Sequence, residues 1–432
     1  MGNPAVANKS VRVFCYFLIA CGIVIRFYSV FDSNPAGNLW SDPQRHWEQG
    51  IDVLRSDPMS QIDPVIYQVY VGIIAKLSLG IPELVGFYTF LLSCLTPWVW
   101  YRFFRELQPD KTVALAGWAF FSVYPVWIGI YSYYMQETLM LPLLGASLYL
   151  TWRCRRKQTV SSFTLMVLVW VLAGLTRGIC IPMAAVAVSW LWFCQSERTV
   201  KAVYSVIVLS LILGPLAIRS YNTMNILAPH GIGYLNVIYA QSGKKEILID
   251  FERDGAVWTY GFASPSIGST PLSPLSDWSS SREGQVRLAV DTRKGMQDWN
   301  AGMKSQQVSL QKYIWISGEN LIYLFFGESW PDSNRETTLG NLNYHSRWLW
   351  SPLFIVCLIW AVARLRRREP VSMLPALIAV WLLFQVFLMI SVNEGRYRFP
   401  LTGLLIGQVV FLVGTRKRKR NNTITVNETA TA

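Results

Sequence analysis

The sequence predicts an α-helical polytopic membrane protein built around a bundle of about ten spanning helices. The chain has 432 residues, of which 52% are hydrophobic and only 15% are charged, against about 25% charged in a typical soluble domain. Long apolar segments recur along it, and the basic residues gather in short loops between alternate segments. This composition excludes a disordered chain, a collagen-like chain and an ordinary soluble enzyme.

Ten segments approach the length of about 20 mostly apolar residues that a spanning helix needs. They are 12–31, 84–101, 112–132, 138–152, 161–176, 179–194, 202–218, 347–363, 371–391 and 400–414. The stretch 65–81 is also apolar, but it carries Lys76 and several polar side chains, so we interpret it as an interfacial helix.

The basic residues orient these helices. With the N-terminus on the inner side, every short inner loop is rich in Lys and Arg, and these loops carry most of the net charge of +13. The positive-inside rule therefore predicts that both termini are cytoplasmic. The apolar run after Arg12 is too long for a signal-peptide core, which indicates a retained first helix. Because the basic residues flank membrane helices, we expect the bilayer and not nucleic acid as the partner.

The spans divide the chain into four parts. We expect an N-terminal transmembrane module at 1–218 with a first outer loop at 32–83. An extracytoplasmic loop domain at 219–346, of α+β or mainly helical structure, follows, and then come C-terminal helices at 347–415 and a basic tail at 416–432. Within the loop domain, 282–304 and 306–326 are predicted helices, the second with an apolar face suited to a membrane surface. The seven cysteines lie in or beside apolar segments and form no C-x-x-C pair, which argues against a disulfide framework or a zinc site.

The outer membrane edge collects unusual polar residues. Charges at this depth are costly and usually face a cavity or a partner. The candidates are Asp42, Arg45, His46, Glu137, Arg177, Arg219, Glu394, Arg396 and Arg398.

Ordinary structural roles remain open for each of them. Arg219 and Arg398 would reach the interface as anchors, Glu137 suits a helix N-terminus, and Asp42 before Pro43 suits an N-cap. His46 shares a helix face with Asp42, but two ligands do not make a metal site. We assign no metal ligand, and a divalent metal ion stays an open alternative.

A functional interpretation of the same residues is specific. The guanidinium fork of arginine matches phosphate oxygens, and a carboxylate opposite it would take a proton from an attacking hydroxyl. Transfer of a sugar from a lipid phosphate fits this pairing, because the phosphate is already a good leaving group. Inversion at the sugar carbon would follow from a single displacement.

Six segments carry a family resemblance. They are SDPQRHWEQG (41–50), DPVIYQVYVGII (63–74), SVYPVWIGIYSYYMQETLMLPLL (122–144), LAGLTRGICIPM (172–183), GPLAIRSYNTMNILAPHGIGYLN (214–236) and NEGRYRFPLTGLL (393–405). In this order the chain resembles the polytopic GT-C glycosyltransferases, nearest to bacterial relatives of dolichyl-phosphate-mannose protein mannosyltransferases and aminoarabinose transferases. Ser220 departs from the pattern, in which Asn is common.

The resemblance implies a GT-C fold, a polyprenyl-phosphate sugar donor and catalysis on the non-cytoplasmic face of a bacterial inner membrane. It implies Asp42 as base, Glu137 as its support, and Arg177, Arg219, Arg396 and Arg398 on the headgroup and phosphate. The residues His46, Arg45, Tyr397 and Glu394 are further candidate substrate contacts. The acceptor would be a lipid, a lipid-linked glycan or a surface polysaccharide. Two alternatives stay open: a transporter or flippase of a lipid-linked sugar, and a non-catalytic subunit of a polysaccharide assembly machine.

Overall fold

The computed structural model describes most of the N-terminal half of the chain and parts of the remainder. The described residues are 4–55, 57–61, 63–108, 110–193, 195–229, 243–244, 246–263, 282–295, 297–298, 301, 307–326, isolated positions between 341 and 363, 373–388 and 395–413. Glu394, the Ser264–Ser281 loop and the tail from 416 onward lie outside this set.

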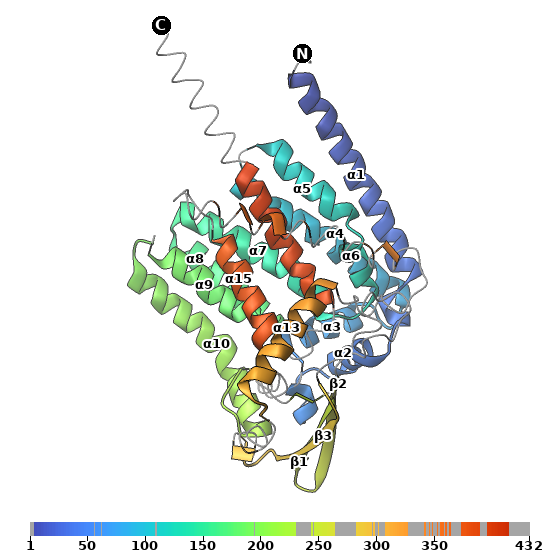
Figure 1. Cartoon of the computed structure of the whole chain (residues 1–432), viewed down its shortest axis with the longest axis vertical. Coiled ribbons are helices and arrows are strands. Elements are labelled where there is room, and N and C mark those ends of the chain that lie inside the picture. The colour runs from blue at the N-terminus through green and yellow to red at the C-terminus, as the bar shows by residue number, and fades with distance from the viewer. Residues whose placement is uncertain are drawn as a thin grey trace.

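Helices dominate the described part (Figure 1). In chain order they are α1 (Pro4–Asp32), α2 (Ser41–Ile51), α3 (Val65–Leu77), α4 (Pro82–Leu107), α5 (Lys111–Val123), α6 (Val126–Gly129), α7 (Gln136–Lys157), α8 (Val160–Thr176), α9 (Cys180–Trp192), α10 (Arg198–Met224), α13 (Leu310–Phe326) and α15 (Leu374–Leu383). A π-helical turn, η5 (Phe384–Leu388), continues α15, and the 3-10 turn η6 (Gly395–Arg398) precedes a last helix at Phe399–Val413. Shorter 3-10 turns are η1 (Pro35–Gly37), η2 (Pro58–Gln61) and η3 (Ile130–Ser132).

Among the described residues, three helices are long and apolar enough to cross a membrane. They cover Lys9–Gly37, Pro82–Leu107 and Arg198–Met224, and a bent pair built from α5 and α6 would make a fourth. Shorter apolar helices are Val65–Leu77, Val160–Thr176, Cys180–Trp192, Leu374–Phe387 and Phe399–Val413. The prediction of a largely helical chain is therefore confirmed, together with the coarser prediction that it contains helices long and apolar enough to cross a membrane.

The predicted span 112–132 is wrong as a single helix, because the chain bends by 62° between α5 and α6. Pro125 explains where α5 ends: a proline disfavours helical backbone at the residue before it, and Tyr124 is extended (φ −70°, ψ 114°). The last carbonyls of α5 are left without helical partners by this break.

Arg26 of α1 satisfies the carbonyls at the bend. It is 1% exposed, and its guanidinium donates to the backbone oxygens of Phe121 (2.7 Å), Ser122 (3.3 Å), Trp127 (2.8 Å) and Ser93 (2.9 Å). Gly22 lies one turn earlier, where a Cβ atom would come within 2.4 Å of the Ser122 oxygen. Gly22 therefore lets α1 approach the bend closely, and Arg26 stabilises the bend. Together they fix the start of the segment that leads to α7.

The core of the bundle centres on Trp100 of α4, which is fully buried. Its indole nitrogen donates to the Leu141 oxygen of α7 at 2.9 Å. Two glycines make room for the ring, since a Cβ atom at Gly145 or Gly403 would lie 2.9 Å or 2.4 Å from it. Trp127 stacks on Phe121 with ring centroids 3.9 Å apart and donates to the Phe399 oxygen. These contacts bind the bend, α4, α7 and the last helix into one unit.

A three-stranded sheet lies at one end of the bundle (Figure 1). It contains β1 (Glu246–Arg253), β2 (Ala256–Ala263) and β3 (Gln285–Asp291) in the order β2-β1-β3, with β1 antiparallel to β2 and parallel to β3. Alternate residues Ile247, Ile249 and Phe251 are buried against Met224 and Ile226. In the hairpin turn, Asp254 and Gly255 have φ of +52° and +83°, as a two-residue turn of this kind requires.

The predicted helix 282–304 is wrong over its first part, where β3 forms. The sequence QVRLAVD alternates Val, Leu and Val with other residues, which is the period of a strand. The pairing with β1 is in register from Glu246↔Gln285 to Glu252↔Asp291. Tertiary pairing thus overrides the helical interpretation. The predicted helix 306–326 is confirmed as α13.

Candidate functional site

Asp42, Arg45 and Asp63 form an ion-pair network in the first predicted outer loop. Arg45 donates from Nη1 to Asp42 Oδ1 (2.6 Å), from Nε to Asp63 Oδ2 (2.6 Å) and from Nη2 to Asp63 Oδ1 (3.2 Å). Asp63 is 4% exposed, whereas the side chains of Asp42 and Arg45 are 25% and 23% exposed. Asp42 is therefore the accessible carboxylate, and buried Asp63 holds the guanidinium that orients it.

Local sequence places these groups. Asp42 and Arg45 lie three residues apart on α2, a spacing that puts them on one helix face. Asp42 is in the first turn of α2 but does not cap it, since the N-cap residue is Trp40 and has no side-chain capping bond. The Ser41 backbone before it has φ of +52°, a conformation that is costly for a residue with a side chain.

Asp63 is held from the opposite direction by α3. Gln68 Nε2 donates to the backbone oxygens of Asp63 and Ser60, both at 2.9 Å. Burial alone would raise the pKa of Asp63, but the nearby Arg45 and His46 outweigh it and hold that pKa below its usual value. Burial opposes the charge on Arg45 as well, yet Asp42 and Asp63 raise its pKa well above the ordinary value. The network is thus ionised and mutually stabilised.

The N-terminus of α7 joins a second ion pair to this network. Gln136 Nε2 donates to Asp63 Oδ1 at 3.1 Å. The next residue, Glu137, is 1% exposed and forms an ion pair with Arg177, which follows the end of α8. A carboxylate in the first turn also suits the positive end of the helix dipole. We call these six residues, Asp42, Arg45, Asp63, Gln136, Glu137 and Arg177, the carboxylate cluster.

Two tyrosines cover the arginines of the cluster. The guanidinium of Arg177 lies over the ring of Tyr397 in η6, 4.5 Å from its centroid, and that of Arg45 lies over the ring of Tyr260 in β2 at 5.4 Å. Burial raises the pKa of Tyr260; Arg45 opposes this, while Asp63, Asp42 and Tyr397 add to it. Tyr260 therefore lies between the first loop and η6, and the site draws on α2, α7, β2 and η6.

His46 supports the network from its buried side. It is 1% exposed, its Nδ1 lies 3.6 Å from Asp63 Oδ2, and its ring packs edge-on against Tyr67 at 5.0 Å. Within the part of the chain that the structure describes, no group of three or more His, Cys, Asp or Glu side chains is placed to hold a metal ion.

Arg219 binds the same loop from α10. Its Nη2 donates to the Arg55 oxygen at 2.8 Å and to Ser60 Oγ at 2.7 Å. It makes no ion pair with any described carboxylate, and its buried Nε has no hydrogen-bond acceptor among the described residues. Arg219 is thus a predicted site residue with a guanidinium donor that no described residue accepts.

Arg398 and its neighbours are arranged differently. Arg398 is 3% exposed and donates from Nη1 to the Leu324 oxygen of α13 at 3.2 Å. It ties η6 to α13. Arg396 belongs to the backbone of η6, but its side chain, like the whole of Glu394, is outside the described part.

The sequence did not predict three residues that contribute to this site: Asp63, Gln136 and Tyr260. A usable indication of Asp63 was present, because the first loop repeats Asp-Pro at 42–43, 57–58 and 63–64. Each pair directly precedes or opens a helical turn, where proline is favoured. Tyr260 arrives through the sheet, and no local pattern indicated its position.

Comparison with known proteins gives no further guide to the site. The chain matches no protein-family model, no curated protein and no solved structure.

Proposed function

We propose that this chain is a membrane glycosyltransferase that transfers a sugar from a polyprenyl-phosphate donor to a lipid, lipid-linked glycan or surface polysaccharide. The observation that carries the proposal is the carboxylate cluster, in which the accessible carboxylate of Asp42 is oriented by Arg45 and the buried Asp63. A base must be both reachable and fixed in direction to accept a proton in a transition state. Asp42 meets both requirements.

The proposed reaction is a single displacement. The acceptor hydroxyl oxygen attacks the anomeric carbon, the bond from that carbon to the phosphate oxygen breaks, and the phosphate leaves with the bonding electrons. The hydroxyl proton passes to the Asp42 carboxylate, and the sugar inverts. Arg219 supports this scheme through its spare Nε donor, because a guanidinium stabilises the charge that develops on a leaving phosphate. Arg396 and Arg398 are proposed to complete the phosphate and headgroup contacts.

Glu137 and Arg177 are proposed to position the site. Their ion pair stands next to Gln136, which bonds Asp63, and beneath Tyr397, which the chain places beside Arg398. His46, Arg45, Tyr397 and Glu394 are proposed to surround the sugar or the acceptor. In this proposal the fold is a GT-C-like bundle of about ten spans in a bacterial inner membrane. Both termini are cytoplasmic, the 219–346 unit is extracytoplasmic, and a metal requirement remains open.

The test is donor consumption by detergent-purified protein with no membrane gradient. The probes are polyprenyl phosphates bearing mannose or aminoarabinose, analysed for released polyprenyl phosphate by mass spectrometry. We expect Asp42→Asn to lower the rate by about 10²–10⁴-fold, the usual contribution of a general base. Asp52→Asn, in the same loop but 62% exposed, is the matched control and should retain the wild-type rate.

Two outcomes would overturn parts of the proposal. Full activity in Asp42→Asn would remove Asp42 as the base. If the folded wild-type protein consumes neither donor but moves a lipid-linked sugar across vesicle membranes, the transporter alternative replaces the enzyme.

A further inference from the structure

The helix α13 buries polar side chains together with Ile316 and Leu324, while most of its exposed side chains are apolar. Its polar side chains Ser317, Glu319 and Asn320 are 3%, 4% and 2% exposed. Most of its exposed side chains are apolar, with Gln311 in the first turn as a polar exception: Leu310, Ile314 and Trp315 are 73%, 58% and 63% exposed. A helix that packs on a protein core in water buries the apolar stripe and exposes the polar one.

The inward polar groups bind neighbouring backbone. Asn320 Nδ2 donates to the Val386 oxygen at 3.1 Å, and the Tyr313 hydroxyl donates to the Phe387 oxygen. Both acceptors lie in the π-helical turn η5, which continues α15. A π-helical turn leaves carbonyls without regular helical partners, and in a membrane such groups need partners from within the protein. The polar face of α13 supplies them.

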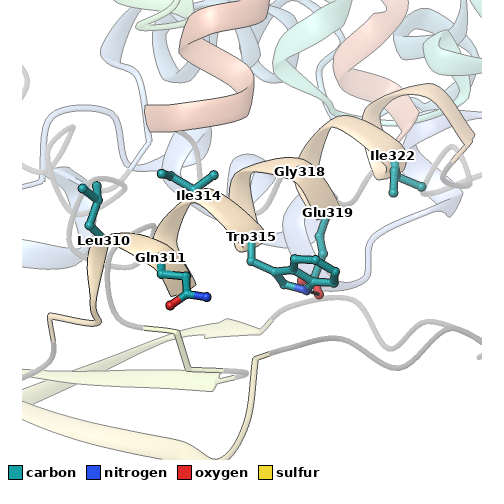
Figure 2. A pocket seen from close by; sticks show the side chains of 7 residues that line it. All are labelled: Leu310, Gln311, Ile314, Trp315, Gly318, Glu319 and Ile322. Carbon is teal, nitrogen blue, oxygen red and sulfur yellow. Dashed lines mark hydrogen bonds between the residues drawn. The ribbon is translucent and has the colours of Figure 1, made fainter.

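The outward face lines a pocket of about 700 Å³ (Figure 2). Its lining repeats along one side of α13 through Leu310, Ile314, Trp315, Gly318 and Ile322. Figure 2 shows the Trp315 ring beside the Glu319 carboxylate, which accepts a hydrogen bond from the indole nitrogen at 3.1 Å. Glu319, which is almost fully buried, is therefore bound by a neighbour on the same helix. Gln311 is the other polar residue of the lining, and the remaining lining residues are apolar or glycine.

The apolar face is continuous with that of a neighbouring apolar helix. Leu383 of α15 and Phe387 of η5 are 56% and 39% exposed, and the Leu374–Phe387 helix is one of the apolar helices of the bundle. Large contiguous apolar surface on a folded protein indicates a binding or membrane surface, and tryptophan is enriched where membrane and water meet.

We propose that the outward face of α13 lies against the hydrocarbon of the bilayer and is covered by phospholipid acyl chains. The buried polar side chains, the exposed apolar ones, the inward bonds to a π-helical turn and the continuity with α15 all favour the same surroundings. In consequence, α13 is set apart from the rest of the 219–346 unit, for which we proposed an extracytoplasmic place. It is a membrane-embedded wall beside η6, to which Arg398 ties it through the Leu324 oxygen. The inference does not depend on the proposed enzymatic activity.

Photo-crosslinking in phospholipid nanodiscs tests this inference. A diazirine analogue of leucine is placed at Ile314 of α13, at Ile207 of α10 and at Val257 of β2, in separate preparations. The three positions have similar exposed fractions, 58%, 50% and 57%, but only Ile207 lies on a helix that is long and apolar enough to span. We expect phospholipid adducts at 314 in a yield like that at 207, and a much smaller yield at 257.

Other products would overturn the inference. Equal, low yields of lipid adduct at 314 and 257 place α13 in water. Adducts between 314 and a second copy of the chain indicate a dimer interface, and adducts to another segment of the same chain indicate an internal cover. The same analogue at Leu310, which is 73% exposed, repeats the measurement if the substitution at 314 prevents folding.

Discussion

The two ends of the helical bundle hold arginine in opposite ways. At the end that carries the sheet, the carboxylate cluster buries two of its three carboxylates: Asp63 and Glu137 are 4% and 1% exposed and each is paired with an arginine. At the other end, where α4 and α7 finish, arginines lie on aromatic rings at the surface. Arg102 lies over Trp98 and Tyr149, and Arg155 over Trp190.

This difference distinguishes arginines in buried ion pairs from exposed arginines on aromatic rings, although both contribute equally to the net charge. Exposed arginines on aromatic rings cost little, and the positive-inside rule predicts such residues in short cytoplasmic loops. Buried ion pairs give back little stability, because desolvation offsets the attraction. Stability alone therefore does not explain why the carboxylate cluster is present, and the proposed reaction offers an explanation. The following predictions test the contrast, from the largest effect to the smallest.

Arg177→Met should have the largest effect on stability. It leaves the Glu137 carboxylate buried without its guanidinium, which costs about 3–5 kcal/mol when one partner of a buried pair is removed. The measurement is thermal unfolding of the purified protein in detergent. The double variant Arg177→Met/Glu137→Gln should recover much of the loss, because no buried charge is then left uncompensated.

The matched control for that variant is the exposed pair at the opposite end. Arg156 and Glu106 are 2.7 Å apart with side chains 61% and 21% exposed. Surface pairs contribute about 0–1 kcal/mol, so Arg156→Met should change stability by no more than this. Equal losses in Arg177→Met and Arg156→Met would contradict the contrast between the two ends.

Asp63→Asn should have an intermediate effect with a distinctive pH dependence. Hydrogen bonds to a charged group contribute about 1.5–3 kcal/mol. The pKa of Asp63 is lower in the folded protein than its ordinary value, so this contribution is complete above the ordinary value of about 3.9. It is lost as the pH falls from there through the lower folded pKa.

The check is thermal stability of the wild type and Asp63→Asn between neutral and acidic pH. The difference between them should be constant from neutral pH down to about 5 and shrink below about pH 4. Asp52→Asn, whose carboxylate is 62% exposed, should differ little from the wild type throughout. A difference for Asp63→Asn that grows as the pH falls would contradict the ionised network.

Arg155→Gln should have the smallest effect. Its guanidinium lies 4.9 Å from the centre of the Trp190 ring, and a cation–π contact at an exposed site contributes about 0.5–1 kcal/mol. The stability loss in detergent should stay within that range. A loss as large as that of Arg177→Met would show that the end where α4 and α7 finish also depends on a strong interaction of a charged side chain.

Much of the helical framework was readable from the sequence, because long apolar stretches and Asp, Pro and Gly at their ends are local signals. The predicted helix at 306–326, which forms α13, and the helices α1, α4 and α10 follow this pattern. The strand at Gln285–Asp291 was missed, although Asp254-Gly255 between two alternating segments is a strong hairpin signal. The break at Tyr124-Pro125 could also be predicted from the sequence. Its stabilisation by Arg26 could not, since Arg26 lies about 95 residues away in the chain.

The site divides in the same way. Asp42, Glu137, Arg177 and Arg219 stand out because charge at a membrane edge is rare, and that rarity is visible in the sequence. Their partners do not stand out. Asp63 becomes the central carboxylate only when α3 turns it toward Arg45, and Tyr260 reaches Arg45 only through the pairing of β1 with β2.

The sequence by itself determined that this is a helical chain with helices long and apolar enough to cross a membrane, and it determined where unusual charges occur. Both follow from transfer free energies, which act on each residue separately and leave a record in composition and period. Tertiary structure decided which charges are paired, that Arg219 Nε has no acceptor among the described residues, and which side chains of α13 are exposed. Those outcomes depend on distances between segments far apart in the chain, and electrostatic energy depends on distance and burial rather than on the identity of one residue.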